Sequence, residues 1–141
     1  MDYVKFGKTG LGVSRLCIGC MTYGIPNRGA HPWTLDEEQS RPLIKQAVEL
    51  GINFFDTANV YSDGTSEEIL GRALKEFTRR EDVVIATKVN GRMRPGPNGA
   101  GLSRKATVCA VSEPTSSIFI RFIDGTRWSR SRRRWKRSTT S

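Results

Sequence analysis

The chain alternates short apolar strands with amphipathic helices, and this alternation limits the folds open to it. Apolar strands are predicted at residues 16–19, 52–55 and 82–87, and helices begin between them near Asp36 and Ser66. A βαβ succession of this kind forms a parallel sheet. Because the strands are apolar along their whole length, the sheet is expected to be covered on both faces or closed into a barrel.

The helices show start and stop signals as well as apolar stripes. Thr34 or Asp36 can cap the first helix, and Gly51 is a natural residue to end it. Ser66, followed by two glutamates, starts the second helix. The positions predicted to face inward are Leu43, Ile44, Ala47, Val48 and Leu50 in the first helix, and Ile69, Leu70, Ala73, Leu74 and Phe77 in the second.

Two further elements flank this series. A hairpin with a Gly-containing turn is predicted over residues 3–16. A loop that contains Gly and Pro occupies residues 91–101, and a helix capped by Ser103 is predicted to begin after it.

Charge divides the chain near Ala106. The 141 residues include 23 Lys and Arg against 14 Asp and Glu, a net charge of +9. Acids nearly balance bases up to Ala106, whereas the basic residues beyond it face only Glu113 and Asp124. We therefore predict a globular part at residues 1–106 and a basic, irregular and disordered tail at residues 107–141. Near its middle, an apolar Ser-Ser-Ile-Phe-Ile stretch favours a short strand or an aggregation-prone segment.

The cysteines do not indicate a metal site. Cys17 and Cys20 have C-x-x-C spacing, but a redox or zinc role would need a helix N-terminus or a second pair of ligands. The pair flanks an apolar strand, and the only histidine is His31. Cys109 is left over; we interpret Cys17 and Cys20 as thiols lining a strand and predict no metal. The first residues lack the apolar core of a signal peptide and no stretch is of transmembrane length, so we expect a cytoplasmic protein without a membrane partner.

Polar side chains follow two of the strands at their carboxyl ends. Asp56 ends the second strand, Tyr61 lies shortly beyond it, and Lys88 follows the third. A phenol, whose unperturbed pKa is about 10, donates a proton poorly unless a cation stabilises its phenolate, and a buried ammonium needs a carboxylate. The three residues suit proton delivery to a carbonyl. Alternatively, Asp56 is a helix-side cap, Tyr61 is an aromatic residue in a loop, and Lys88 is a solvated strand end.

Several segments resemble the aldo-keto reductases, nearest the bacterial and fungal branch related to potassium-channel β subunits. They are residues 11–24, 51–61 (G-I-N-F-F-D-T-A-N-V-Y), 66–74 (S-E-E-I-L-G-R-A-L) and 86–89 (A-T-K-V). The likeness extends to about residue 106. It implies an incomplete (α/β)8 TIM barrel, with the N-terminal hairpin and the first three βα units present.

The resemblance also implies a reaction, the NADPH-dependent reduction of small aldehydes and ketones to alcohols. By position, Tyr61 would be the general acid, Lys88 would lower the pKa of the tyrosine, and Asp56 would pair with the lysine at the cofactor site. Cys20 and Met21 would line the nicotinamide pocket. The family's catalytic histidine after the fourth strand and its basic loop for the 2′-phosphate of NADPH have no counterpart here, so we expect a truncated and inactive reductase.

The tail fits a displaced reading frame. With suitable codons, the residues after Ala106 can be read one frame away as D-S-L-R-R-L-G-T-D-F-V-D-L-Y-Q-I-H-R-W-D-P, the continuation expected of the family. We hypothesise a frame-shifted, truncated product, which sequencing of the gene would test. The alternative is a nucleic-acid-binding module built on residues 129–137. We favour an incidental origin because arginine-rich strings are typical of GC-rich coding sequence read out of frame.

Overall fold

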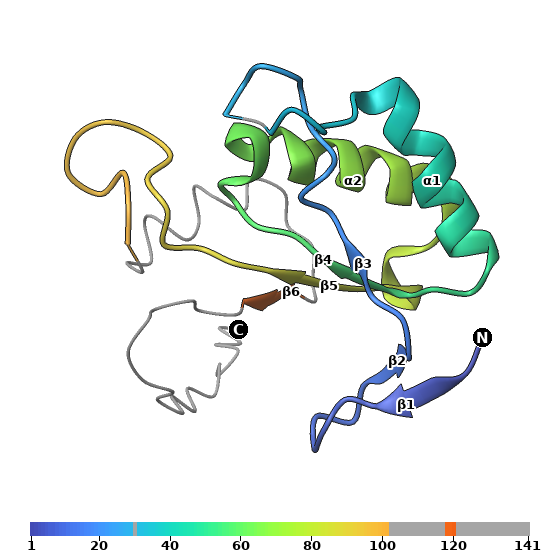
Figure 1. Cartoon of the computed structure of the whole chain (residues 1–141). Helices are drawn as coiled ribbons and strands as arrows, with labels where there is room; N and C mark the ends of the chain where they lie inside the picture. Colours follow the sequence, from blue (N-terminus) through green and yellow to red (C-terminus); the bar gives the residue numbers. More distant parts are fainter. Residues whose placement is uncertain (30, 102–117, 121–141) are drawn as a thin grey trace, which may run out of the picture.

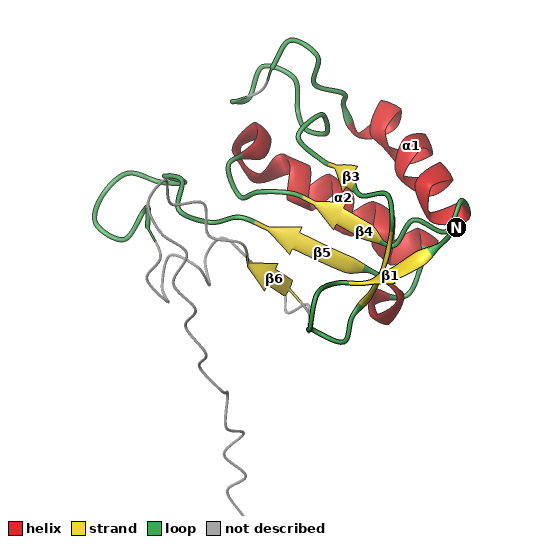
Figure 2. Cartoon of the chain, turned by 60° about the horizontal axis from the view of Figure 1, so that its bottom comes forward, coloured by secondary structure: helices red, strands yellow, loops and turns green. Residues whose placement is uncertain are grey.

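The computed structural model of the protein describes residues 1–29, 31–101 and 118–120, which Figure 1 traces from blue to red. The elements in chain order are β1 (Tyr3–Lys5), β2 (Gly12–Ser14), β3 (Ile18–Gly19), α1 (Glu37–Glu49), β4 (Phe54–Asp56), the 3₁₀ turn η1 (Tyr61–Gly64), α2 (Thr65–Phe77), the 3₁₀ turn η2 (Arg80–Asp82), β5 (Val84–Thr87) and β6 (Ile118–Ile120). β1 and β2 form an antiparallel hairpin, and the remaining strands form a parallel sheet in the order β3-β4-β5-β6. α1 and α2 pack side by side on one face of that sheet (Figure 2).

The predicted hairpin and the predicted βαβ succession are thus confirmed for the first three parallel strands. Over the described residues, the four parallel strands form an open arc and not a closed barrel. The helix predicted to begin at Ser103, the boundary near Ala106 and the basic segment at residues 129–137 lie outside the described residues. Within that part of the chain, no helix is long and apolar enough to cross a membrane.

The hairpin is attached to the amino end of β4 by hydrogen bonds of the Asn53 side chain and by an aromatic contact. Asn53 accepts a hydrogen bond from the Ser14 backbone N–H at 2.8 Å and donates to the Gly12 carbonyl at 3.1 Å. The rings of Phe6 and Phe54 meet edge to face, with centroids 5.5 Å apart. The hairpin therefore lies at the end of the sheet opposite the strand carboxyl ends.

Asp36 is the residue that caps α1, because its Oδ1 accepts from the Gln39 N–H at 2.9 Å. Gly51 follows the helix with φ +81°, as the predicted stop requires. Two positions predicted to face inward are wrong, since Leu43 is 45% and Leu50 is 60% exposed. The buried stripe of α1 is centred on Ser40, Ile44 and Ala47; Leu43 lies at its margin, and Leu50 lies beyond the last turn.

α2 buries the predicted face and begins at Thr65, one residue before the predicted start at Ser66. Ile69, Leu70, Ala73 and Leu74 are buried. The N-cap is Gly64, with φ +89° and no capping side chain. Ser66 lies inside the helix, and its hydroxyl instead donates to the Cys20 carbonyl at 2.6 Å. The predicted helix start at Ser66 is therefore confirmed to within one residue, and the Ser66 hydroxyl is bonded to the segment after β3.

The core lies between the sheet and the two helices. Phe55 is fully buried at its centre, so Phe54 and Asp56, its neighbours in β4, point to the other face of the sheet. The other buried members are Cys20, Tyr23, Ile44, Ala47, Ile52, Ile69, Leu70, Ala73, Leu74 and Val83. This alternation places Asp56 on the face away from the helices.

β6 extends the sheet beyond β5. Its three residues pair in parallel with Ile85, Ala86 and Thr87. Of the two interpretations of the apolar stretch in the tail, the backbone pairing supports the short strand.

Candidate active site

The carboxyl ends of β3, β4 and β5 meet along one edge of the sheet, where the candidate residues lie. Gly19 of β3 is the register partner of Asp56, and Asp56 is the partner of Ala86 in β5. The ladder continues past the end of β4, because the Asn59 N–H donates to the Lys88 carbonyl at 3.0 Å. Asp56 and Lys88 are therefore held at the carboxyl ends of neighbouring strands.

Lys88 makes contact with both other candidate catalytic residues. Its Nζ donates to Oδ1 of Asp56, and the same atom lies 5.0 Å from the centroid of the Tyr61 ring. The Lys88 side chain is 12% exposed and that of Asp56 is 34% exposed. The structure thus brings all three side chains together, with the ammonium largely withdrawn from solvent and the carboxylate partly open to it.

The charge of Lys88 is stabilised by these neighbours. Burial by itself would lower the pKa of Lys88, but hydrogen bonds and electrostatic attraction to Asp56 and Tyr61 outweigh burial and raise it. Lys88 is accordingly an ammonium at neutral pH.

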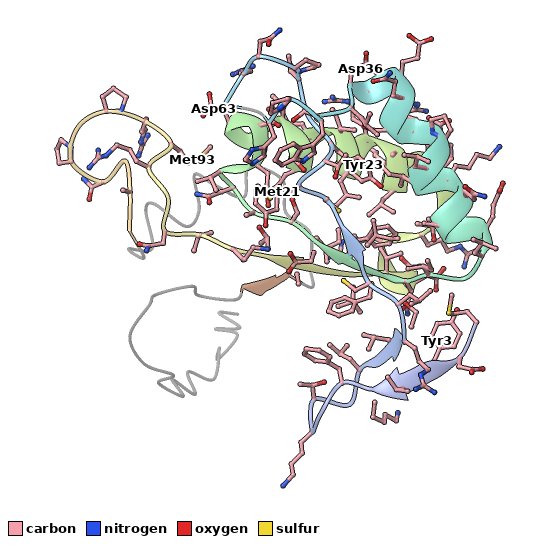
Figure 3. The ribbon with its side chains drawn as sticks, in the orientation of Figure 1. Tyr3, Met21, Tyr23, Asp36, Asp63 and Met93 are labelled. Atoms are coloured by element: carbon pink, nitrogen blue, oxygen red, sulfur yellow. The ribbon has the colours of Figure 1, made fainter. Side chains whose placement is uncertain are left out.

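Tyr61 is presented by an unusual turn between β4 and α2. Ser62 and Asp63 both have positive φ, at 46° and 55°, and Gly64 follows with φ 89°. The Tyr61 N–H donates to the Ala58 carbonyl at 3.2 Å. Figure 3 shows Asp63 in this turn beside the loop from the end of β3. The side chain of Asp63 forms an exposed ion pair with Arg28 at 3.6 Å.

The two residues predicted to line a nicotinamide pocket differ in their surroundings. The Cys20 side chain is fully buried in the core between sheet and helices, and burial raises the pKa of its thiol strongly. Met21 is 39% exposed and follows β3 beside the carboxyl ends of the strands (Figure 3). Of these two side chains, only that of Met21 is exposed and can contact a ligand.

Two further residues at this edge were missed by the sequence analysis. Cys17 lies near Asp56 and Lys88; burial and the charge of Asp56 raise the pKa of its thiol, while Lys88 opposes them. It lies two positions before Gly19, which pairs with Asp56, so strand alternation combined with the register could have placed it on this face.

Glu67 is the second missed residue. It lies in the first turn of α2 and accepts a hydrogen bond from the Thr87 hydroxyl, beneath the end of β5. Burial raises the pKa of Glu67, and the Thr87 bond and the charge of Lys88 offset it in part. Helical periodicity could not reveal it, because the contact depends on how α2 crosses β5.

A small pocket of about 120 Å³ lies away from this site. Its lining includes Tyr3, Gly51, Asn53 and Asp82, at the amino ends of the strands. Chemistry at the carboxyl ends does not use it.

Comparison with known proteins identifies the family. A sequence model described as the aldo/keto reductase family matches residues 15–115. The chain belongs to this family. The family resemblance first seen in the sequence is therefore confirmed.

Individual aldo/keto reductase relatives support the same assignment. The chain is 42% identical to the versiconal hemiacetal acetate reductase of Aspergillus parasiticus over 129 residues, which cover 79% of the chain and 37% of that protein. It is 38% identical to a probable voltage-gated potassium channel β subunit of Arabidopsis thaliana, over 88% of the chain and 36% of that protein.

A solved aldo-keto reductase structure from Bacillus halodurans, in its holo form, matches with a TM-score of 0.56 and 38% identity. The match covers 71% of the chain and 30% of that structure. The chain thus spans little more than a third of the length of the relatives it matches.

Proposed function

We propose that this chain carries the proton-donating part of a site that reduces small aldehydes and ketones with NADPH. The observation that supports this proposal is the position of Lys88 Nζ, in contact with the Asp56 carboxylate and 5.0 Å from the Tyr61 ring. A cation beside a phenol favours loss of the phenolic proton, which is what a proton donor to a carbonyl oxygen needs.

Each of the three residues has a separate part in this proposal. Tyr61 gives its proton to the carbonyl oxygen as that oxygen gains negative charge. The Lys88 ammonium stabilises the phenolate that remains. Asp56 keeps Lys88 charged and oriented, since a largely buried ammonium without a carboxylate would lose its proton.

The residues present fit one end of a nicotinamide cofactor. Met21 is exposed, and the N–H of Cys20, the residue before it, donates to the Asp56 carbonyl at 2.8 Å, so the backbone at Met21 lies beside the carboxyl end of β4. Met21 and Asp56 would contact the cofactor, and bound NADPH would supply the hydride. The aldo-keto reductase from Bacillus halodurans with a similar fold is a holo form, which supports the need for a cofactor.

A single-turnover experiment on the purified chain tests the proposal. The chain is mixed with NADPH carrying tritium on its transferable hydrogen and with a simple aldehyde, and the labelled alcohol is counted. Because the chain spans about a third of its relatives, we expect transfer to be slow. Transfer that is lost in Tyr61→Phe and Lys88→Met supports the proposal. If the wild-type chain transfers no more label than Tyr61→Phe does, the proposal is refuted for this chain.

A further inference from the structure

The turn that carries Tyr61 is strained and needs support from outside. The backbone at Ser62 and Asp63 has a left-handed conformation that residues other than glycine rarely adopt. Ser62 is also buried, 3% exposed, and its hydroxyl finds no hydrogen-bond partner among the described residues. Strain of this kind persists only where surrounding structure holds the backbone in place.

The first support comes from Gly24, in the loop after β3. A Cβ on Gly24 would lie 2.1 Å from Oγ and 2.2 Å from Cβ of Ser62, so its backbone lies directly against that side chain. The next residue is fixed as well, because the Ile25 N–H donates to Thr65 Oγ1 at 3.0 Å. The Thr65 hydroxyl in turn donates to the Ser62 carbonyl at 2.7 Å.

The second support comes from Gly91, in the loop after β5. A Cβ on Gly91 would lie 2.0 Å from Cγ1 of Val60 but 3.4 Å from its Cβ. Val60 is 43% exposed, so rotation of its side chain could relieve such a contact. Ser62 has no such freedom, since its Cβ is itself too close and is attached to the strained backbone. The contact at Gly24 is therefore the stricter of the two.

We propose that Gly24, and more weakly Gly91, are positioning residues that clamp the turn from two sides and hold Tyr61 against Lys88. Tyr61 lies between Val60 and Ser62, the residues on which the two glycines press. A side chain at position 24 would displace Ser62 and withdraw the phenol from the ammonium. The role of this clamp in catalysis rests on the proposed function. The contacts of Gly24 with Ser62 and of Gly91 with Val60 are independent of it.

The test measures how readily Lys88 reacts, with neither cofactor nor carbonyl present. The full chain is treated briefly with acetic anhydride at fixed pH, and acetylation of each lysine is followed by mass spectrometry. Lys45, which is exposed, serves as internal reference. In Gly24→Ala, loss of the hydrogen bond between Tyr61 and the charged amine should make Lys88 react about tenfold faster. Gly12→Ala is the matched control, because a Cβ there meets nothing within 4 Å among the described residues.

Rescue separates positioning from general damage. The double variant Gly24→Ala/Ser62→Gly removes the side chain that the added methyl group would strike, so Lys88 should react at the wild-type rate again. Gly91→Ala should have a smaller effect than Gly24→Ala. Wild-type reactivity of Lys88 in folded Gly24→Ala would overturn the proposal, as would a double variant that fails to restore it. If Gly24→Ala does not fold, a folded double variant with wild-type reactivity supports the clamp, and an unfolded or unrestored one overturns it.

Discussion

Replacing Asp56 by Asn removes the carboxylate that keeps Lys88 charged, so the folded chain must either hold an unpaired ammonium or give up its proton. The Lys88 side chain is 12% exposed, so water can replace little of what the carboxylate provides. Replacing Lys88 by Met leaves the opposite situation, because the Asp56 side chain is 34% exposed and can be hydrated. The two substitutions break the same ion pair but should differ in their effect on the free energy of unfolding.

The magnitudes follow from burial. Removing one partner of a fully buried ion pair costs about 3–5 kcal/mol, whereas exposed pairs contribute about 0–1 kcal/mol. Because Asp56 is one-third exposed, we expect Asp56→Asn to lower the free energy of unfolding by about 2 kcal/mol. Lys88→Met should lower it by about 1 kcal/mol or less. In urea, the difference should appear as a shift in midpoint of roughly 0.5–1 M.

The dependence on pH adds an independent check. The pKa of Lys88 is raised in the folded chain, so its stabilising contribution is complete below the unfolded value of about 10.4 and is lost as the pH rises through the folded pKa. In Asp56→Asn, only Tyr61 opposes the effect of burial on the pKa of Lys88, so the variant should lose less stability than the wild type as the pH rises. The stability difference between wild type and Asp56→Asn should therefore narrow above about pH 10.4.

Lys45→Met is the matched control. Lys45 pairs with Glu49 at 3.7 Å on the surface of α1, with both side chains more than half exposed. Its removal should change the free energy of unfolding by less than about 0.5 kcal/mol. If Lys88→Met destabilises the chain as much as Asp56→Asn does, the ammonium does not depend on the carboxylate and the reasoning fails.

Three further substitutions probe the surroundings of the site. Burial raises the pKa of Glu67, so ionisation of its carboxyl group costs stability as the pH rises above about 4.3. Glu67→Gln can still accept the hydrogen bond from Thr87, and urea unfolding should show it to be more stable than the wild type at neutral pH but not below about pH 4.3. Phe55→Ala should cost about 3–5 kcal/mol, because the ring is fully buried at the centre of the core, and a smaller loss in urea would show that the core collapses around the gap. Arg72→Ala removes a two-point contact with Glu37 on an exposed surface, so thermal unfolding should show a cost of under about 1 kcal/mol that diminishes with added salt.

The order of elements could be predicted because the signals were local. Asp36 caps α1 through a bond to a residue three positions on, and Gly51 ends it through its own backbone conformation. The start of α2 near Ser66 was predicted as well, but the bond from the Ser66 hydroxyl to a carbonyl of the segment after β3 was not. Side chains that serve a distant segment cannot be assigned from local pattern.

The candidate site was predictable in part for the same reason. Asp56 and Lys88 stand at strand ends, and parallel pairing brings such positions together. Cys17 and Glu67 were missed, because the first needs the register of β3 on β4 and the second needs the crossing of α2 over β5. The left-handed backbone at Ser62 gave no signal, since serine has no preference for that conformation.

The two halves of the proton-donating group are therefore held by different means. Asp56 and Lys88 lie at the ends of adjacent strands, so strand spacing keeps them within reach, and the Asn59 bond to the Lys88 carbonyl continues that ladder. Tyr61 depends on a strained turn that neighbouring loops hold in place. A perturbation of the loop after β3 should consequently separate the phenol from the ammonium while leaving the ion pair intact. Loss of the ion pair together with the phenol contact would mean that the sheet edge itself had come apart.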